Sequence, residues 1–253
     1  MNFKLSTLVA ASLLTCTSGL TMAAENDVSF SGTAAMTTDY RYRGISQTEN
    51  DPAVQVGFAL AHASGVYGGV WGSNVNFGTA DPHLELDPYL GYSTELSSFA
   101  SKPTLDVGVW YYGYPSSSDS NWAEYYARLT FGSVFMADDS LYTNVNYAND
   151  FLGDDAEGDQ WYLNAVYSFP IANTGFGGVA SLGYTTTSDY EYDAEGSNDY
   201  LDWKLGATYG FKSVEGLTAE LAAVGTDIDT DGLDHASKRI VDTGAVFTIT
   251  KAF

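Results

Sequence analysis

The sequence predicts an all-β protein, an antiparallel up-and-down β-barrel that spans a membrane with about 12 strands, in a range of roughly 10 to 14. Three observations support this fold class. Apolar and polar residues alternate along successive segments, short connections alternate with long acidic ones, and the chain ends on an aromatic residue, Phe253. A soluble β-sandwich would not sort its acidic residues by alternate loops.

Alternation with period two is clear in residues 201–211, where Leu201, Trp203 and Leu205 alternate with Asp202 and Lys204. Such a strand has one apolar and one polar face. Residues 104–111 and 241–253 follow the same pattern. The expected strands lie near 27–40, 53–62, 66–77, 88–98, 103–114, 121–132, 140–149, 159–169, 175–187, 199–211, 216–226 and 240–253.

Two local features bear on the strand boundaries. In residues 66–77, either Val66 with Val70 or Tyr67 with Trp71 can form the outer face. Prolines are expected in loops or at strand ends, because a closed barrel has no edge strand where a missing N–H is harmless. They are Pro52, Pro82, Pro88, Pro103, Pro115 and Pro170.

The charge is strongly acidic and unevenly placed. The formal net charge is −22, and residues 150–159, 188–199 and 227–238 hold 14 of the 32 acidic residues. These segments follow odd-numbered strands, whereas connections after even strands, such as 62–65 and 212–215, are short. Long loops outside the cell and short periplasmic turns are typical of outer-membrane barrels. The charge excludes nucleic acid as a partner, and the 15% aromatic content argues against disorder.

Aromatic residues are expected to form two girdles, one at each membrane interface. Those at the turn ends of strands are Phe30, Phe131, Phe169, Phe176, Phe211 and Phe253. Those at the loop ends are Tyr112, Tyr114, Trp122, Tyr147, Trp161, Tyr184 and Tyr200. The terminal Phe253, on an amphipathic last strand, resembles the signal that the barrel-assembly machinery reads.

Residues 1–24 are expected to be a cleaved signal peptide. Lys4 precedes a short apolar stretch, and cleavage is expected after Ala23 or Ala24. The barrel domain would then be residues 25–253. The only cysteine, Cys16, lies in the signal, so the mature chain would carry no thiol, disulfide or cysteine-based metal site.

Residues 38–48 read Thr-Asp-Tyr-Arg-Tyr-Arg-Gly-Ile-Ser-Gln-Thr and are followed by Pro-Ala-Val-Gln at 52–55. This segment resembles the signature of the TorF-like porin family, and residues 65–75, 84–92 and 108–115 agree with it. The resemblance spans most of the mature chain and is most specific in its first third. It implies a porin with no established solute, and it brings no catalytic residue and no cofactor.

Charged residues opposite the apolar face indicate what a lumen would favour. The expected pore-lining residues are Glu95, Asp106, Glu124, Asp202, Glu220 and Asp242, with Arg128 and Lys204. Such a lumen should favour cations or zwitterions. The alternative is that these charges pair across the lumen and merely fill it.

Arg41 and Arg43 are expected at the outer mouth, at the top of the first strand, with their side chains on one face and Tyr40 and Tyr42 on the other. One interpretation is an arginine pair that meets the lumen acids and sets the constriction. The other is a pair that binds lipopolysaccharide phosphate.

A weak divalent-cation site is a further candidate. Asp227, Asp229 and Asp231 have the spacing that begins a Ca²⁺-binding loop, with Gly232 following. The twelfth position is Lys238, where such a loop needs a bidentate glutamate, so a solvated acidic loop is the alternative.

The expected function is passive diffusion of small polar solutes across the outer membrane of a Gram-negative bacterium. An enzyme is not expected, although His83 near Asp81 and Glu85, and His235 beside Asp234, are the nearest to an acid–base pair; His62 lies in a short turn. The alternative is a non-conducting structural or adhesive barrel. Its acidic loops would bind lipopolysaccharide or a partner.

Overall fold

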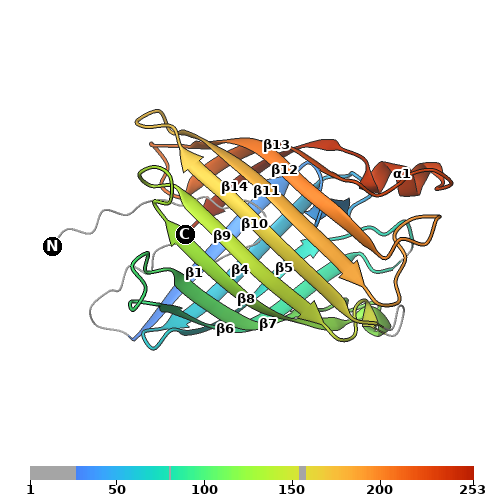
Figure 1. Cartoon of the computed structure of the whole chain (residues 1–253), viewed down its shortest axis with the longest axis horizontal. Coiled ribbons are helices and arrows are strands. Elements are labelled where there is room, and N and C mark those ends of the chain that lie inside the picture. Colours follow the sequence, from blue (N-terminus) through green and yellow to red (C-terminus); the bar gives the residue numbers. More distant parts are fainter. Residues whose placement is uncertain (1–26, 80, 154–157) are drawn as a thin grey trace.

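A computed structural model describes residues 27–79, 81–153 and 158–253, and the expected signal peptide lies outside these residues. The prediction of a 12-stranded antiparallel barrel is confirmed (Figure 1). The wall consists of β1 (Val28–Thr37), β4 (Ala53–His62), β5 (Val66–Asn74), β6 (Leu84–Glu95), β7 (Thr104–Tyr112), β8 (Trp122–Gly132), β9 (Ser140–Ala148), β10 (Gln160–Pro170), β11 (Phe176–Thr187), β12 (Asp199–Gly210), β13 (Leu217–Thr226) and β14 (Gly244–Ala252). Strands β1 and β14 close the ring, from Thr33 opposite Ala252 to Thr37 opposite Thr248.

The outer face of the barrel is apolar and exposed. In β12, Leu205 is 65% exposed, while its neighbours Asp202 and Lys204 are buried on the inside. The same exposed band includes Val56, Phe58, Leu90, Leu163, Leu182, Leu221 and Phe247. Exposed apolar area on this scale needs a hydrocarbon surrounding. Across 27–79, 81–153 and 158–253, no helix is long and apolar enough to cross a membrane.

Predicted strand boundaries were wrong by three residues or more in β1, β5, β6 and β14. Strand β5 ends at Asn74 and not at 77, and β6 begins at Leu84 and not at 88. The choice of outer face in β5 is settled by burial, because Val66 and Val70 are exposed whereas Trp71 is buried.

The prediction for Pro88 was also wrong, because it lies inside β6, opposite Val70 of β5. On the other side of β6, Pro88 lies just outside the segment paired with β7, because that pairing begins at Tyr89, opposite Trp110. Beyond that gap, the Gly113 N–H donates to the Asp87 side chain at 3.2 Å, and Leu86 N–H donates to Gly113 O at 2.8 Å. A side-chain acceptor therefore holds the strands together where proline interrupts the ladder.

The aromatic girdles agree with the prediction only in part. Phe30, Phe176 and Phe253 are exposed at the short-turn end, and Trp161 and Tyr184 are exposed at the other. Tyr112, Tyr114, Trp122 and Tyr200 are instead buried inside the barrel. Their strand parity places them on the lumen face, so only part of the predicted outer girdle faces the membrane.

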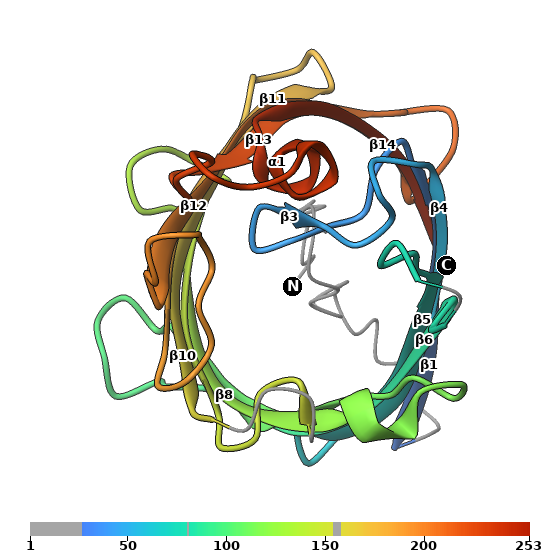
Figure 2. The ribbon, with the colours of Figure 1, turned by 90° about the vertical axis from the view of Figure 1, so that its right-hand side faces the viewer.

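The two ends of the barrel differ. The short turns, such as 63–65 and 211–216, lie at the end where β1 begins and β14 finishes (Figure 1). The long connections lie at the other end, and two of them turn inward. Residues 38–52 carry the two-residue strands β2 (Arg41–Tyr42) and β3 (Ile45–Ser46), and residues 227–243 carry α1 (His235–Val241). Seen down the barrel, β3 and α1 lie within the outline of the ring (Figure 2), and α1 lies at the long-loop end (Figure 1).

Candidate functional site in the barrel lumen

Residues 38–52, here called the inserted loop, form a tight hairpin. Strands β2 and β3 pair through Arg41 with Ser46 and Tyr42 with Ile45. The two residues of the turn, Arg43 and Gly44, have φ values of 49° and 85°. This conformation suits a two-residue hairpin turn, whose positions normally favour asparagine, aspartate or glycine. An arginine at the first position is therefore an unusual choice.

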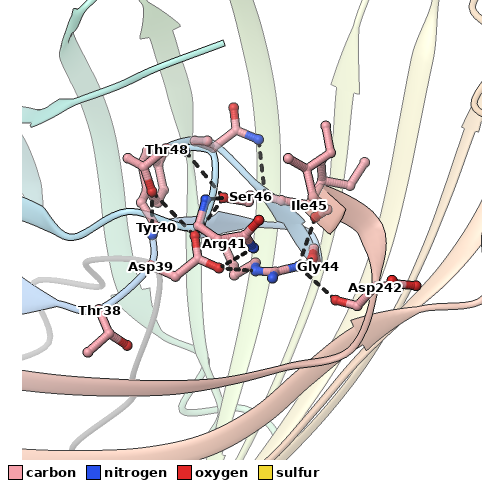
Figure 3. A network of polar contacts seen from close by, with 12 residues as sticks. Thr38, Asp39, Tyr40, Arg41, Gly44, Ile45, Ser46, Thr48 and Asp242 are labelled. Carbon is pink, nitrogen blue, oxygen red and sulfur yellow. Dashed lines mark hydrogen bonds and ion pairs between the residues drawn. The ribbon is translucent and has the colours of Figure 1, made fainter. Parts of the chain in front are cut away.

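Asp39 organises the inserted loop (Figure 3). Its carboxylate accepts hydrogen bonds from Arg41 Nε at 2.5 Å, Ser46 Oγ at 2.6 Å, Thr48 Oγ1 at 3.3 Å and Asn50 Nδ2 at 3.2 Å. These donors come from both sides of the hairpin. A single buried carboxylate thus fixes the hairpin's direction, since hydrogen bonds to charged groups are the stronger ones.

Arg41 joins the inserted loop to the last long loop. Its Nη1 donates to the main-chain oxygens of Gly44 at 2.9 Å, Ile240 at 2.8 Å and Asp242 at 3.1 Å (Figure 3). The prediction that Arg41 lies at the top of the first strand was therefore wrong, because β1 ends at Thr37 and the chain turns into the lumen.

Gly44, at the tip of the hairpin, packs against β13 and β12, which lie two and three strands from β1 in the ring. A Cβ atom on Gly44 would lie 2.5 Å from Thr226 Cγ2 and 2.9 Å from the main-chain oxygen of Gly225, both at the end of β13. It would also lie 3.1 Å from Asp202 Cβ on β12. The hairpin leaves the wall between β1 and β4 and turns toward the β13 side of the ring, and only glycine fits at its tip.

Arg43 enters a pocket built by the wall. Its Nη2 donates to Glu124 Oε2 of β8, and its Nη1 donates to Gln160 Oε1 of β10. Its guanidinium carbon lies 4.0 Å from the ring centroid of Tyr162 and 4.6 Å from that of Tyr42. All the polar partners are buried. We call this the arginine pocket; it combines an ion pair, a neutral acceptor and two aromatic faces, which suits a planar cation.

Further side chains hold the pocket in place. Glu124 Oε1 accepts from Asn146 Nδ2 of β9 and from the Tyr112 hydroxyl at 3.4 Å. Beside the guanidinium, the Tyr162 hydroxyl donates to Asp202 Oδ1 at 3.3 Å. Asp202 Oδ2 and Arg43 Nε are buried with no hydrogen-bond partner. The inside of the pocket therefore retains one unused acceptor and one unused donor.

Other predicted lining residues form cation–carboxylate pairs along the wall. Lys204 Nζ lies 3.2 Å from Glu220 Oε1, and Arg128 Nη1 lies 3.8 Å from Asp106 Oδ2. Asp106 also accepts from the Tyr67 hydroxyl at 2.5 Å. These side chains face the lumen and balance one another locally.

Two predicted lining residues lie elsewhere. Asp242 does not project from a strand, because it follows α1 and β14 begins only at Gly244; its side chain is exposed. Glu95 lies at the exposed short-turn end of β6. Glu95 is still paired, opposite Thr104 of β7, whereas Asp242 precedes the first residue of β14.

Sequence reasoning missed Glu85 and Asp87, which are both buried on the inner face of β6. The Trp110 Nε1–H donates to Asp87 Oδ2 at 2.9 Å, and the Tyr40 hydroxyl lies 3.5 Å from Glu85 Oε1. The alternation of Leu84, Glu85, Leu86 and Asp87 carries the signal. Pro88 obscures this signal, because a proline in a closed barrel is expected at a strand end.

An unbroken run of neighbouring rings lines one side of the lumen, with centroid distances between 4.0 and 6.5 Å. In order, the rings are Tyr67, Tyr89, Trp110, Tyr112, Trp122, Phe151, Tyr190, Tyr192 and Tyr200. The inserted loop packs on this wall through Tyr42 against Tyr112 at 5.7 Å, and through Tyr40 against Trp71 at 5.4 Å. Aromatic packing therefore adds to the polar anchoring of the hairpin.

The structure does not bring the three aspartates of the candidate cation site together. Asp227 Oδ1 accepts from Leu201 N–H at 2.6 Å, and Asp229 Oδ1 accepts from Asp231 N–H at 2.8 Å. Within the described ranges, no group of three potential metal-ligating side chains is found. These carboxylates shape the loop backbone.

The histidines form no group with the lumen carboxylates. His83 Nδ1 lies 3.1 Å from Asp81 Oδ1 on an exposed surface, while Glu85 points inward. His62 Nδ1 contacts Ser64 Oγ at 2.8 Å in a short turn. His235 begins α1, where Asp234 instead caps the helix by accepting from Ala236 and Ser237 N–H.

A closed 12-stranded barrel with an apolar outer band and a polar lumen has the fold of outer-membrane channels. The chain belongs to a family described as bacterial protein of unknown function (Gcw_chp), whose model matches residues 21–253. No curated protein matches the sequence.

Solved structures resemble the fold. The NanC porin has a TM-score of 0.56 and 13% identity, over 88% of this chain and 98% of that one. The outer-membrane channel DcaP of Acinetobacter baumannii has a TM-score of 0.44 and 8% identity, over 89% and 97% of the two chains.

Proposed function

We propose that this protein is an outer-membrane channel for passive diffusion of small polar solutes, and that the inserted loop forms its constriction. The observation that carries the proposal is the hairpin that enters the lumen, where Arg43 reaches the opposite strands β8 and β10 and Gly44 packs against β13. The porin fold of the NanC neighbour supports the same class.

We further propose that the channel favours cations or zwitterions. Among the described lumen residues, six enclosed carboxylates (Glu85, Asp87, Asp106, Glu124, Asp202 and Glu220) face three cationic side chains (Arg43, Arg128 and Lys204). The charge of Arg41 is balanced by its ion pair with Asp39. An excess of fixed negative charge in a low-dielectric cavity raises the local concentration of cations.

Planar-bilayer recording under a salt gradient tests this selectivity. The reversal potential should have the sign of cation permeation, and an anion-selective reversal potential would refute the charge argument. Glu85→Gln and Asp87→Asn should move the reversal potential toward zero. The exposed Asp119→Asn in the connection between β7 and β8 serves as a matched control and should leave it unchanged.

The location and partners follow from the same proposal. The exposed apolar band would contact outer-membrane lipid, the long-loop end would face lipopolysaccharide, and the exposed Phe253 would be presented to the barrel-assembly machinery. The narrower assignment to TorF-like porins stays a prediction from residues 38–55. The expectation that the protein is no enzyme also stays a prediction.

A non-conducting barrel is the second candidate function, because the lumen is tightly filled at the level of the hairpin. Trp110, Tyr112, Trp122 and Tyr162 are all at most 6% exposed there. Liposome swelling with small sugars and amino acids separates the two functions. Swelling supports the channel, and silent liposomes that contain folded barrel support the structural role.

A further inference from the structure

We propose that the arginine pocket is a binding site for guanidinium-bearing solutes, which the chain's own Arg43 occupies at rest. This inference deepens the proposed function, and it rests on that function only for the step in which bound solute affects conduction. Binding itself can be measured without a membrane.

The polar groups of the pocket and its Tyr162 face come from the wall, whereas its second aromatic face, Tyr42, comes from the hairpin. Glu124, Asn146, Gln160 and Asp202 come from β8, β9, β10 and β12, four different strands of the closed sheet. Glu124 is held by Asn146 and Tyr112, and Tyr162 is oriented toward Asp202. A site on such rigid elements keeps its geometry when its occupant leaves.

The chemistry of the pocket selects a planar, fork-shaped cation. One nitrogen of the guanidinium meets a carboxylate, another meets an amide oxygen, and the plane lies over the Tyr162 ring at 4.0 Å. An ammonium ion has no planar face to stack, and a sodium ion cannot donate hydrogen bonds. The pocket should therefore distinguish guanidinium from both.

Arg43 is an imperfect occupant. It sits in left-handed backbone conformation at φ 49°, where side chains other than glycine and asparagine are disfavoured. Its Nε is buried without a partner, and so is the nearby Asp202 Oδ2. A free guanidinium ion has no backbone strain and can rotate to donate an N–H to Asp202 Oδ2, so it can compete with the tethered arginine.

The affinity expected for added guanidinium depends on its competition with the Arg43 side chain. A side chain tethered beside its own site acts as a ligand at millimolar effective concentration or more. Wild-type protein should thus bind guanidinium weakly, while removal of the Arg43 side chain should strengthen guanidinium binding by about tenfold or more.

The test is calorimetric titration of the full barrel in detergent micelles with guanidinium chloride, at concentrations far below those that unfold proteins, against sodium chloride at matched ionic strength. Arg43→Ala should bind guanidinium at least about tenfold more tightly than wild type. The double variant Arg43→Ala with Glu124→Gln should lose that gain. Tryptophan fluorescence gives a second readout, since Trp122 stacks on Tyr112 at 4.0 Å and Tyr112 contacts Glu124.

Arg239→Ala is the matched control, because Arg239 is half exposed and pairs with Glu49 away from the pocket. It should bind guanidinium as wild type does. If Arg43→Ala fails to fold, Arg43→Gln keeps a neutral side chain in the pocket and tests the same gain. Folded Arg43 variants that bind guanidinium no more tightly than wild type would overturn the inference. A barrel that binds guanidinium but passes no current would instead overturn the proposed function alone.

Discussion

A single methyl group at the hairpin tip should release the constriction. In Gly44→Ala, the new Cβ would lie 2.5 Å from Thr226 Cγ2 and 2.9 Å from Gly225 O, at a φ of 85°. The left-handed backbone costs alanine about 1–2 kcal/mol. Overpacking against the wall backbone costs about 1–3 kcal/mol more.

These costs are comparable with the free energy of the contacts that hold the hairpin tip against the wall. Arg43 docks through two hydrogen bonds that involve a charged group, which contribute about 1.5–3 kcal/mol each. Loss of about 2 kcal/mol lowers the ratio of docked to undocked hairpin about 30-fold. The variant should therefore spend a measurable fraction of time with an undocked hairpin.

Single-channel recording in planar bilayers should show larger or additional conductance states in Gly44→Ala. Gly78→Ala is the control, because Gly78 has a similar φ of 76° but its added Cβ would meet only Glu49 Oε1 at 3.4 Å. It carries the backbone cost without the clash. Identical traces for Gly44→Ala, Gly78→Ala and wild type would refute the reasoning.

Three further predictions concern the loops and the wall. Arg41→Ala removes the contacts to Ile240 and Asp242 oxygens, so trypsin should cleave after Lys238 faster than in wild type, and unchanged cleavage would contradict the link. Burial disfavours the charged form of Asp139, but the N–H donors of Phe135, Met136 and Val134 and the Tyr167 hydroxyl lower its pKa. The ionised Asp139 therefore stabilises the folded state. This contribution is complete above the unfolded-state pKa of about 4 and is lost as the pH falls through the lower folded-state pKa. Asp139→Asn should accordingly lower the urea midpoint at neutral pH, with a difference from wild type that shrinks in acid; a pH-independent difference would count against this. Leu205→Arg, near the middle of β12 on the outer face, should cost about 2–4 kcal/mol in vesicle unfolding experiments, and a neutral result would argue against lipid contact there.

The barrel could be predicted from the sequence because its signals are local. Each strand alternates by itself, and the side chains of Asp202 and Lys204 follow from parity alone. The errors arose where a distant partner decides the outcome. Where Pro88 interrupts the ladder with β7, the Asp87 side chain accepts from Gly113 N–H, and Tyr112 packs against Tyr42 of the inserted loop, a contact that periodicity does not reveal.

The site followed the same division. The sequence indicates which kinds of residue line the lumen, but not which of them pair. The structure pairs Arg43 with Glu124, which are far apart in the chain. The sequence predicts Arg43 at the mouth, because from the sequence alone a two-residue hairpin with an arginine at its turn cannot be distinguished from a continuation of the strand. The depth of insertion depends on the four donors that bind Asp39 and on the close fit of Gly44 against β13.

Liposome swelling with solutes of graded size, before and after excision of the hairpin, tests the central claim most directly. Gln47 N–H donates to Tyr40 O at 2.7 Å, so residues 41–46 can be replaced by a short glycine linker between neighbours that already pair. Wild-type barrels should admit only small solutes, and the excised variant, shown to be folded, should admit larger ones at higher rates. An unchanged size limit in the excised variant would contradict the role of the inserted loop as the constriction.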